Sequence, residues 1–338
     1  MKEKKEYWQS IRGICILAVI LIHSLGGFNY STGYGTEFVV LRQIINFAVA
    51  TFVFMAGYFV NVDALSDKEF SYKHWIIYRG GRLCIPFMIW SLLYSGLELL
   101  KIVHSGNEIH WFGFVYRFIV GKSATPFYYI VVLVQLTVIT PWLVKTVKQN
   151  GVISRILWLV TPLYLMYLYA WNYIVGISPR LYETLFPAWF GFYYLGIHVR
   201  CGWKLKGNGY AVVATLLLSC VEAICLRAAG LDIGFYISQI TVGSFLYSIA
   251  MIGWLLKKNE NNRSGCRLLS KIGDCSYGIF YIHMAVLMIV GRIIECENWY
   301  AYWALRFVLT SFISYIVVHL AQMTLKNHKE LLRYIGFV

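Results

Sequence analysis

Long apolar runs recur from one end of the chain to the other, and they constrain its fold more than any other feature. A run of about 17 to 25 apolar residues is long enough to cross a hydrocarbon core of roughly 30 Å. Charged residues make up only 14% of the 338 residues, whereas soluble proteins contain about a quarter. The sequence therefore predicts an all-α, polytopic integral membrane helical bundle.

We expect about ten membrane-spanning helices, one for each of the clearest apolar runs. The predicted spans are Ile14–Ser24, lengthened on both sides, Phe38–Asn61, Leu83–Leu100, Tyr128–Val144, Ile156–Tyr173, Phe186–Val199, Ala211–Arg227, Gln239–Leu256, Tyr277–Val290 and Trp303–Met323. The run at Phe186–Val199 is the shortest of them. No segment is left for a separate soluble domain, so residues 1–338 are predicted to form a single membrane-embedded domain.

The net charge of +14 indicates how the chain is oriented. Cytoplasmic loops of membrane proteins are enriched in Lys and Arg. With ten spans, the basic start (Lys2, Lys4 and Lys5) and the basic end, residues 326–333, fall on the same side. We therefore predict a multi-pass protein of the cell (cytoplasmic) membrane with both termini in the cytoplasm, surrounded by membrane lipid. This distribution accounts for the charge without nucleic acid, which is not a predicted partner.

The eight cysteines and the external connections are less informative. The cysteines form no C-x-x-C pair, so neither a zinc site nor a disulfide framework is predicted. The connections predicted to face outward, Gly26–Glu37, His104–Thr125 and Ser178–Leu185, are rich in Tyr, Trp, Gly and Phe. Aromatic residues there are typical of an interfacial belt, and a platform for stacking sugars is the alternative.

Ionisable residues within the apolar runs are costly, so each is a functional candidate until it is given a structural partner. They are Arg12, His23, Glu98, Glu222, Arg227, His283, Arg306 and His319. For Glu98 we expect either an ion pair with a basic group of another helix or a catalytic acid. Glu222 and Arg227 are expected to satisfy each other, and His283 and His319 to be packing residues.

Arg12 and His23 are spaced so that one ligand can reach both. Eleven residues of α-helix rise about 16 Å and turn about 20° beyond three full turns. The two side chains therefore lie on nearly the same helical face, with Arg12 at the cytoplasmic boundary and His23 in the middle to outer half of the bilayer. From spacing alone, a packing histidine and a functional histidine remain equally good interpretations of His23.

Several motifs occur in one order along the chain. Arg12 and His23 form an Arg-x10-His pattern in the first helix, and Arg79-Gly80-Gly81-Arg82 forms an Arg-x-x-Arg pattern in the first cytoplasmic loop. Phe54–Tyr58 is similar to Phe-x-Ser-Gly-Phe, and Cys275–His283 to Ser-Tyr-x-x-Tyr-x-x-His. In these motifs, and over essentially its whole length, the chain resembles the acyltransferase-3 family of integral membrane acyltransferases.

The resemblance implies an acyl-CoA-dependent O-acyltransferase. The acyl group, often acetyl and sometimes succinyl, would go from cytoplasmic acyl-CoA to a hydroxyl of a cell-surface or exopolysaccharide glycan or of a lipid-linked sugar. Arg79 and Arg82 suit the phosphates of CoA, because a guanidinium is a planar, permanently charged fork of donors. His23 can be neutral and act as general base, while Arg12 aligns the CoA arm or stabilises charge on the thioester oxygen.

The same resemblance bears on cofactors and partners. Acetyl-CoA or another acyl-CoA is the expected donor, and no metal is expected. The resemblance is also compatible with two kinds of protein partner. These are proteins of polysaccharide synthesis or export, and a second copy of the chain. Where many members have a His-Leu-Trp-Phe-like segment, this chain reads Pro126-Phe127-Tyr128-Tyr129, which concerns the shape of the acceptor pocket more than the chemistry.

The alternative function is a polysaccharide exporter or small-molecule transporter, in which His23 and Glu98 take part in a proton relay. Arg79 and Arg82 discriminate between the two, because a transporter needs no clamp for CoA phosphates. Transporters also more often have paired halves with helices broken by Gly or Pro.

Overall fold

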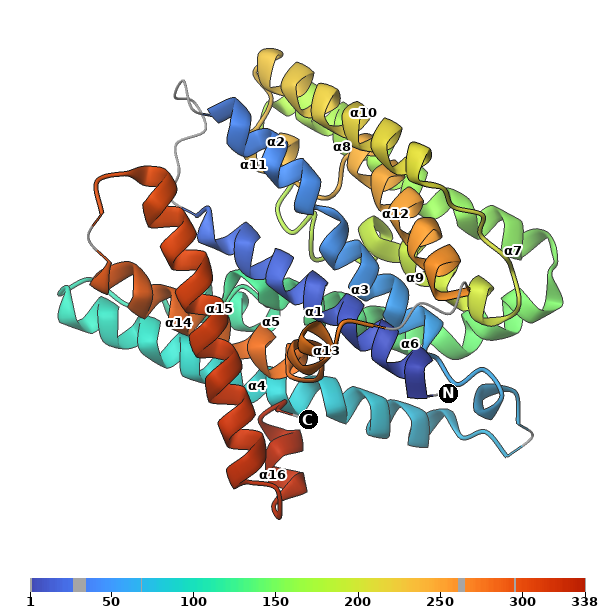
Figure 1. The fold of residues 1–338 in the computed structure, drawn as a ribbon, viewed down its shortest axis with the longest axis horizontal. Coiled ribbons are helices and arrows are strands. Elements are labelled where there is room, and N and C mark those ends of the chain that lie inside the picture. Colours follow the sequence, from blue (N-terminus) through green and yellow to red (C-terminus); the bar gives the residue numbers. More distant parts are fainter. Residues whose placement is uncertain (1, 27–34, 68, 261–264, 295, 338) are drawn as a thin grey trace. The chain divides into compact units, whose positions relative to one another are not determined.

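The structure of the chain is a computed structural model that describes residues 2–26, 35–67, 69–260, 265–294 and 296–337 (Figure 1). Every regular element within these ranges is a helix, which confirms the predicted all-α class. Most of the predicted external connection Gly26–Glu37 lies outside the described residues. The chain forms two compact units, Met1–Phe70 with Ile139–Lys271, and Ser71–Val138 with Ile272–Val338.

The first unit holds most of the helices. They are α1 (Lys2–Ser24), α2 (Gly35–Ile45), α3 (Phe47–Tyr58), η1 (Ala64–Ser66), α7 (Val152–Ile156), η3 (Leu157–Leu159), α8 (Val160–Val175), α9 (Pro187–Arg200), α10 (Gly209–Ala228), α11 (Ile233–Tyr236) and α12 (Val242–Glu260). Within this unit α3 packs on α1, α9 and α12, and α10 packs on α2 and α12 (Figure 1).

The second unit is built around one long helix. Its elements are α4 (Tyr72–His104), α5 (Trp111–Ile119), η2 (Thr125–Phe127), α14 (Ser276–Ile293), α15 (Trp299–Thr324) and α16 (Lys329–Tyr334). Helix α14 packs on α15, while α16 and α5 pack on α4 (Figure 1). Helices α6 (Tyr128–Gln149) and α13 (Arg267–Asp274) each run from one unit into the other.

Eight helices in the described ranges are long and apolar enough to cross a membrane. They are Glu6–Ser24, Gly35–Tyr58, Tyr72–His104, Thr125–Gln149, Val152–Val175, Gly209–Ala228, Ser276–Ile293 and Trp299–Thr324. Only 11% of the α10 window and 17% of the α15 window is buried inside the chain, so most of their apolar surface is available to lipid. The other two predicted runs coincide with α9 and α12, which are also helical.

Helix α9 is a short helix in the core of its unit. All residues from Ala188 to Ile197 are buried, as expected of a helix that is apolar on every side. A Cβ at Gly196 would meet the backbone of Phe54 and Tyr58, and one at Gly57 would meet the backbone of Tyr193. These glycines allow α3 and α9 to approach closely, which gives the motif at Phe54–Tyr58 a packing role.

A cluster of polar side chains interrupts the second predicted run. The amide nitrogen of Asn46, between α2 and α3, donates to the carbonyl oxygen of Ser238 at 3.0 Å. The amide oxygen of Gln43 accepts from the hydroxyls of Ser219 at 2.7 Å and Ser244 at 2.9 Å. These bonds satisfy polar groups away from water, and they tie α2 to α10 and α12.

Aromatic side chains form the core of the second unit. The hydroxyl of Tyr94 on α4 donates to the carbonyl oxygen of Tyr281 on α14 at 2.8 Å. Phe127 is fully buried, with its ring centroid 5.4 Å from that of Tyr94. Trp90 stacks on Tyr281 and on Phe337, with ring centroids 6.1 and 6.0 Å apart. The departure at Pro126–Tyr129 thus supplies a core aromatic residue.

Helix α5 lies in a connection for which the sequence predicts no helix, His104–Thr125. None of its nine residues is buried, and Phe112 is 88% exposed. A short amphipathic helix that is rich in aromatic residues is typical of the membrane–water interface.

Candidate active site

Helix α1 is continuous from Lys2 to Ser24 and is firmly packed in the first unit. The hydroxyl of Tyr7 donates to the carbonyl oxygen of Leu255 at 2.8 Å, and that of Ser10 donates to the carbonyl oxygen of Cys266 at 3.0 Å. The unbroken helix preserves the geometry expected from the sequence. Arg12 and His23 are therefore about 16 Å apart along the axis and nearly on one face.

Arg12 is half-buried and follows the start of the candidate span Glu6–Ser24 by six residues. Its guanidinium donates to the amide oxygen of Gln9 at 3.1 Å and lies 5.5 Å from the ring centroid of Phe59. A cation over an aromatic face keeps its charge while it loses water. Arg12 is thus a held but still partly accessible positive charge.

His23 lies in the last turn of α1, where its carbonyl oxygen accepts from the backbone nitrogen of Gly26 at 3.1 Å. Its side chain is half-buried. His283 contrasts with it, because that side chain is completely buried and its Nδ1 is 3.0 Å from the carbonyl oxygen of Ile279 in its own helix. Of these two histidines, His23 has the more exposed side chain.

Arg79 and Arg82 lie inside helix α4, which corrects the expectation that they belong to a loop. The helix begins at Tyr72, so the three-residue spacing places both guanidinium groups on one side. Arg79 lies over the ring of Trp75 at 5.0 Å, and Arg82 lies over that of Tyr78 at 5.7 Å. Neither arginine pairs with a carboxylate of the described chain.

Two glycines separate these arginines. A Cβ at Gly80 would meet nothing within 4 Å, and one at Gly81 would meet only the end of the Ile85 side chain at 3.9 Å. Glycine inside a helix costs about 0.5–1 kcal/mol relative to alanine. Since no packing explains the two glycines, the open backbone beside Arg79 and Arg82 is suited to the close approach of a ligand.

A third arginine that the motifs do not include joins this cluster. Arg333 on α16 contacts the same aromatic ring as Arg82. Its guanidinium lies 5.4 Å from the ring centroid of Tyr78. It also pairs at 3.8 Å with Glu330, which is largely exposed. The basic C-terminal end was the sequence signal for Arg333, but only the packing of α16 on α4 brings it to this place.

The remaining ionisable residues have structural partners. Glu98 pairs with Arg117 of α5 at 2.6 Å, which confirms the predicted ion pair.

Glu222 accepts from the hydroxyl of Tyr169 and from the backbone nitrogen of Gly243, whereas Arg227 donates to the hydroxyl of Thr36 at 3.2 Å. The expectation that Glu222 and Arg227 satisfy each other is therefore wrong, because distant segments supply closer partners. Two further ring contacts are those of His319 with Tyr315 and of Arg306 with Tyr302.

No metal centre is evident in the part of the chain that the structure describes, where no three His, Cys, Asp or Glu side chains gather as ligands. The charged groups described above are suited to anionic ligands, and each unit contributes its own. Arg79, Arg82 and Arg333 supply positive charge in the second unit, while Arg12 and His23 supply charge and a proton acceptor in the first.

Comparison with known proteins agrees with these features. A family model described as an acyltransferase domain matches residues 5–333, nearly the whole chain. No curated protein and no solved structure gives a significant match. The matched residues include α1 with Arg12 and His23, and α4 with Arg79 and Arg82.

Proposed function

The chain belongs to this acyltransferase family and is a membrane acyltransferase, and from that membership we propose that it moves an acyl group from acyl-CoA to a hydroxyl of a glycan. An acetyl group is the proposed cargo, with succinyl as the second choice. The proposed location is the cytoplasmic membrane, and the proposed acceptor is a cell-surface or exopolysaccharide glycan or its lipid-linked precursor. Family membership disfavours the exporter and transporter alternative.

The observation that carries the proposal is the placement of His23. It is a half-buried histidine in the last turn of an uninterrupted helix, with a half-buried arginine on nearly the same face about 16 Å away. A ligand that lies along this face contacts a positive charge at one end and an imidazole at the other. A structural histidine would be enclosed, as His283 is.

Each residue has a distinct role in the proposed reaction. Arg79 and Arg82 bind the phosphates of CoA, because their charges have no carboxylate partner in the described residues. Neutral His23 takes the proton of the acceptor hydroxyl, whose oxygen forms a bond to the thioester carbonyl carbon. The carbon–sulfur bond breaks, and the CoA sulfur leaves with the proton that His23 returns. Arg12 aligns the CoA arm or stabilises negative charge on the thioester oxygen.

The test is a His23→Ala variant of the purified full-length chain. Because a general base contributes about 10²- to 10⁴-fold in rate, we expect transfer to fall by that factor while acyl-CoA binding remains measurable. Transfer is followed with labelled acetyl-CoA and succinyl-CoA. Mass spectrometry of surface glycans from cells with and without the chain then shows whether the mass of an acetyl or a succinyl group is lost from the glycan.

Glu98→Gln is the matched control, because it removes a charged group from an ion pair that the proposal does not use. This variant should retain transfer within a few-fold, since exposed ion pairs contribute about 1 kcal/mol or less. Full transfer activity in His23→Ala would contradict the assignment of His23 as the general base. An unchanged glycan acylation pattern together with lost polymer export would instead favour the transporter.

A further inference from the structure

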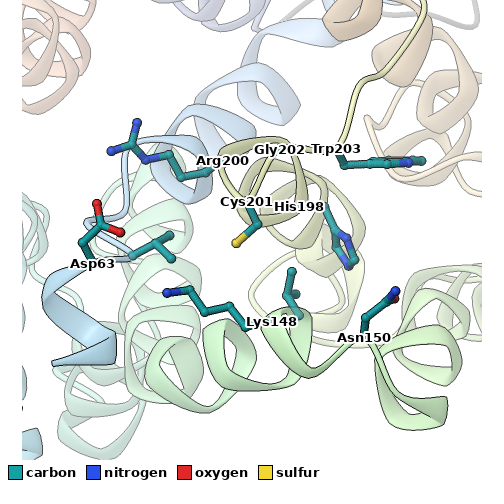
Figure 2. Close-up of a pocket in the computed structure, with 10 residues that line it drawn as sticks. Asp63, Lys148, Asn150, His198, Arg200, Cys201, Gly202 and Trp203 are labelled. Carbon is teal, nitrogen blue, oxygen red and sulfur yellow. The ribbon is translucent and has the colours of Figure 1, made fainter. Parts of the chain in front are cut away.

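The first unit contains an open pocket that the proposed reaction does not use. Its volume is about 820 Å³, and it lies where three helices end (Figure 2). The segment after α3 contributes Val62 and Asp63, the end of α6 contributes residues 147–150, and the end of α9 contributes residues 198–203. The sequence predicts all three of these connections to face the cytoplasm.

One end of the pocket is charged. Figure 2 shows Asp63, Lys148 and Arg200 on the same side of Cys201. The ammonium of Lys148 donates to the hydroxyl of Ser66 at 2.6 Å. Neither cation forms an ion pair within the described ranges, and Asp63 pairs with neither of them. Positive charge therefore exceeds negative charge here, and it remains available to an anion.

The other end of the pocket is built from rings. Figure 2 shows His198, Trp203 and Asn150 on the far side of Cys201 from the charged end. The ring centroids of His198 and Trp203 are 5.9 Å apart, and the Trp203 side chain is 48% exposed. The Nε2 atom of His198 is buried and has no hydrogen-bond partner among the described atoms. Most buried polar atoms are bonded, so this nitrogen is an exception among the described atoms.

We infer that this pocket binds a nucleotide on the cytoplasmic side of the membrane, with its phosphates on Lys148 and Arg200 and its base on Trp203. A half-exposed indole offers a stacking face to any planar base, and a guanidinium and an ammonium are the usual phosphate ligands. The volume lies within the range of roughly 300–1,000 Å³ that small-molecule sites occupy.

Two sources share this chemistry, a free nucleotide and the nucleotide end of CoA. We assign the pocket to a free nucleotide, because the proposed function gives the phosphates of CoA to Arg79 and Arg82, and neither of these arginines lines the pocket. This choice between the two sources rests on the proposed function, whereas nucleotide binding itself does not require catalysis. An inactive chain tests it equally well.

The experiment uses Cys201 as a reporter, because this exposed cysteine lies between the two ends of the pocket. The purified full-length chain is alkylated with a maleimide at increasing concentrations of ADP, and peptide mass spectrometry follows Cys201. Exposed Cys266, which is outside the pocket, is the internal reference. We expect ADP to slow the alkylation of Cys201 several-fold, roughly in line with site occupancy, and to leave Cys266 unchanged.

Variants identify the ligands of ADP. Lys148→Ala and Arg200→Ala should each weaken protection by ADP roughly 10- to 100-fold, the usual effect of losing a charge-assisted contact. Lys145→Ala is the matched control, because Lys145 is exposed on the same helix but does not line the pocket. All three side chains are exposed, so none of these changes should impair folding. In the double variant Arg79→Ala/Arg82→Ala, ADP should protect Cys201 from alkylation as well as it does in the wild type.

Three outcomes would overturn the assignment. If ADP does not slow the alkylation of Cys201, the pocket does not bind a nucleotide. Equal protection by inorganic phosphate would reduce the pocket to a simple anion site. Protection by CoA alone, lost in the Arg79→Ala/Arg82→Ala variant, would make the pocket part of the donor site.

Discussion

At the scale of single residues, the partners of the charged groups separate structural from functional candidates. Glu98 and Arg117 neutralise each other at 2.6 Å, and Glu222 is bonded by Tyr169. The arginines of α4 differ, because each lies over an aromatic ring of its own helix. A ring keeps a guanidinium in place without neutralising it, so such an arginine remains ready for an anionic ligand.

Replacing these arginines should affect the donor rather than the chemical step. Hydrogen bonds to charged groups contribute about 1.5–3 kcal/mol. We therefore expect Arg79→Ala and Arg82→Ala each to raise the Kd for acyl-CoA roughly 10- to 100-fold, while kcat at saturating donor changes little. Direct binding of acyl-CoA to the purified chain and separate measurement of kcat and KM check this.

Arg333→Ala gives the comparison within the same cluster. Glu330 already offsets part of the charge of Arg333, so the loss of donor affinity should be smaller than for Arg82→Ala. If all three variants bind acyl-CoA as the wild type does, the cluster on α4 and α16 is not the phosphate site.

At the scale of helices, glycine has opposite meanings in α9 and α4. In α9 a Cβ at Gly196 would overlap the backbone of α3, so glycine is required for packing. In α4 a Cβ at Gly80 would enter open space. The same residue type thus indicates a close helix–helix contact in one element and an accessible surface in the other.

Substitution by alanine should separate these two meanings. Gly196→Ala forces backbone apart, and overpacking of this kind costs about 1–3 kcal/mol, so we expect a lower midpoint of thermal unfolding in detergent. Gly80→Ala, the matched control, should stabilise α4 by about 0.5–1 kcal/mol. If a ligand approaches the α4 backbone, Gly80→Ala also raises the KM for acyl-CoA. Equal stability of the two variants would contradict the packing role of Gly196.

At the scale of the whole chain, the distribution of charge predicts topology. Eight candidate spans meet length and hydropathy requirements among the described residues, and α9 and α12 complete the ten predicted runs. We predict that all ten runs cross the membrane, and together with the basic ends of the chain this number predicts that both termini are cytoplasmic. An odd number of crossings would place one basic end outside.

Reporter fusions test this topology in a bacterial host. A fluorescent protein at the C-terminus should fluoresce, and alkaline phosphatase at the same position should be inactive, because that end is predicted to be cytoplasmic. Fusion of alkaline phosphatase after Ser105, in the predicted external connection, is the matched control and should be active. Phosphatase activity at the C-terminus would require an odd number of crossings.

The sequence alone predicted the features that depend on neighbouring residues. Hydropathy identifies helices because each membrane-spanning helix bonds its own backbone, whatever it packs against. The common face of Arg12 and His23 follows from the helical period, and an unbroken α1 preserves it. The prediction that Arg79 and Arg82 lie in a loop was wrong. The first residues of α4 include too few apolar side chains for hydropathy to identify them as part of that helix.

Only the tertiary structure decided which distant residues meet. It paired Glu222 with Tyr169, brought Arg333 to Tyr78, and made a pocket from segments that are far apart in the sequence. Such partners are chosen by helix packing, and neither hydropathy nor helical period encodes which helices become neighbours. The sequence thus determined a helical membrane protein with a histidine and an arginine on one face, while the fold determined which other charges were left for ligands.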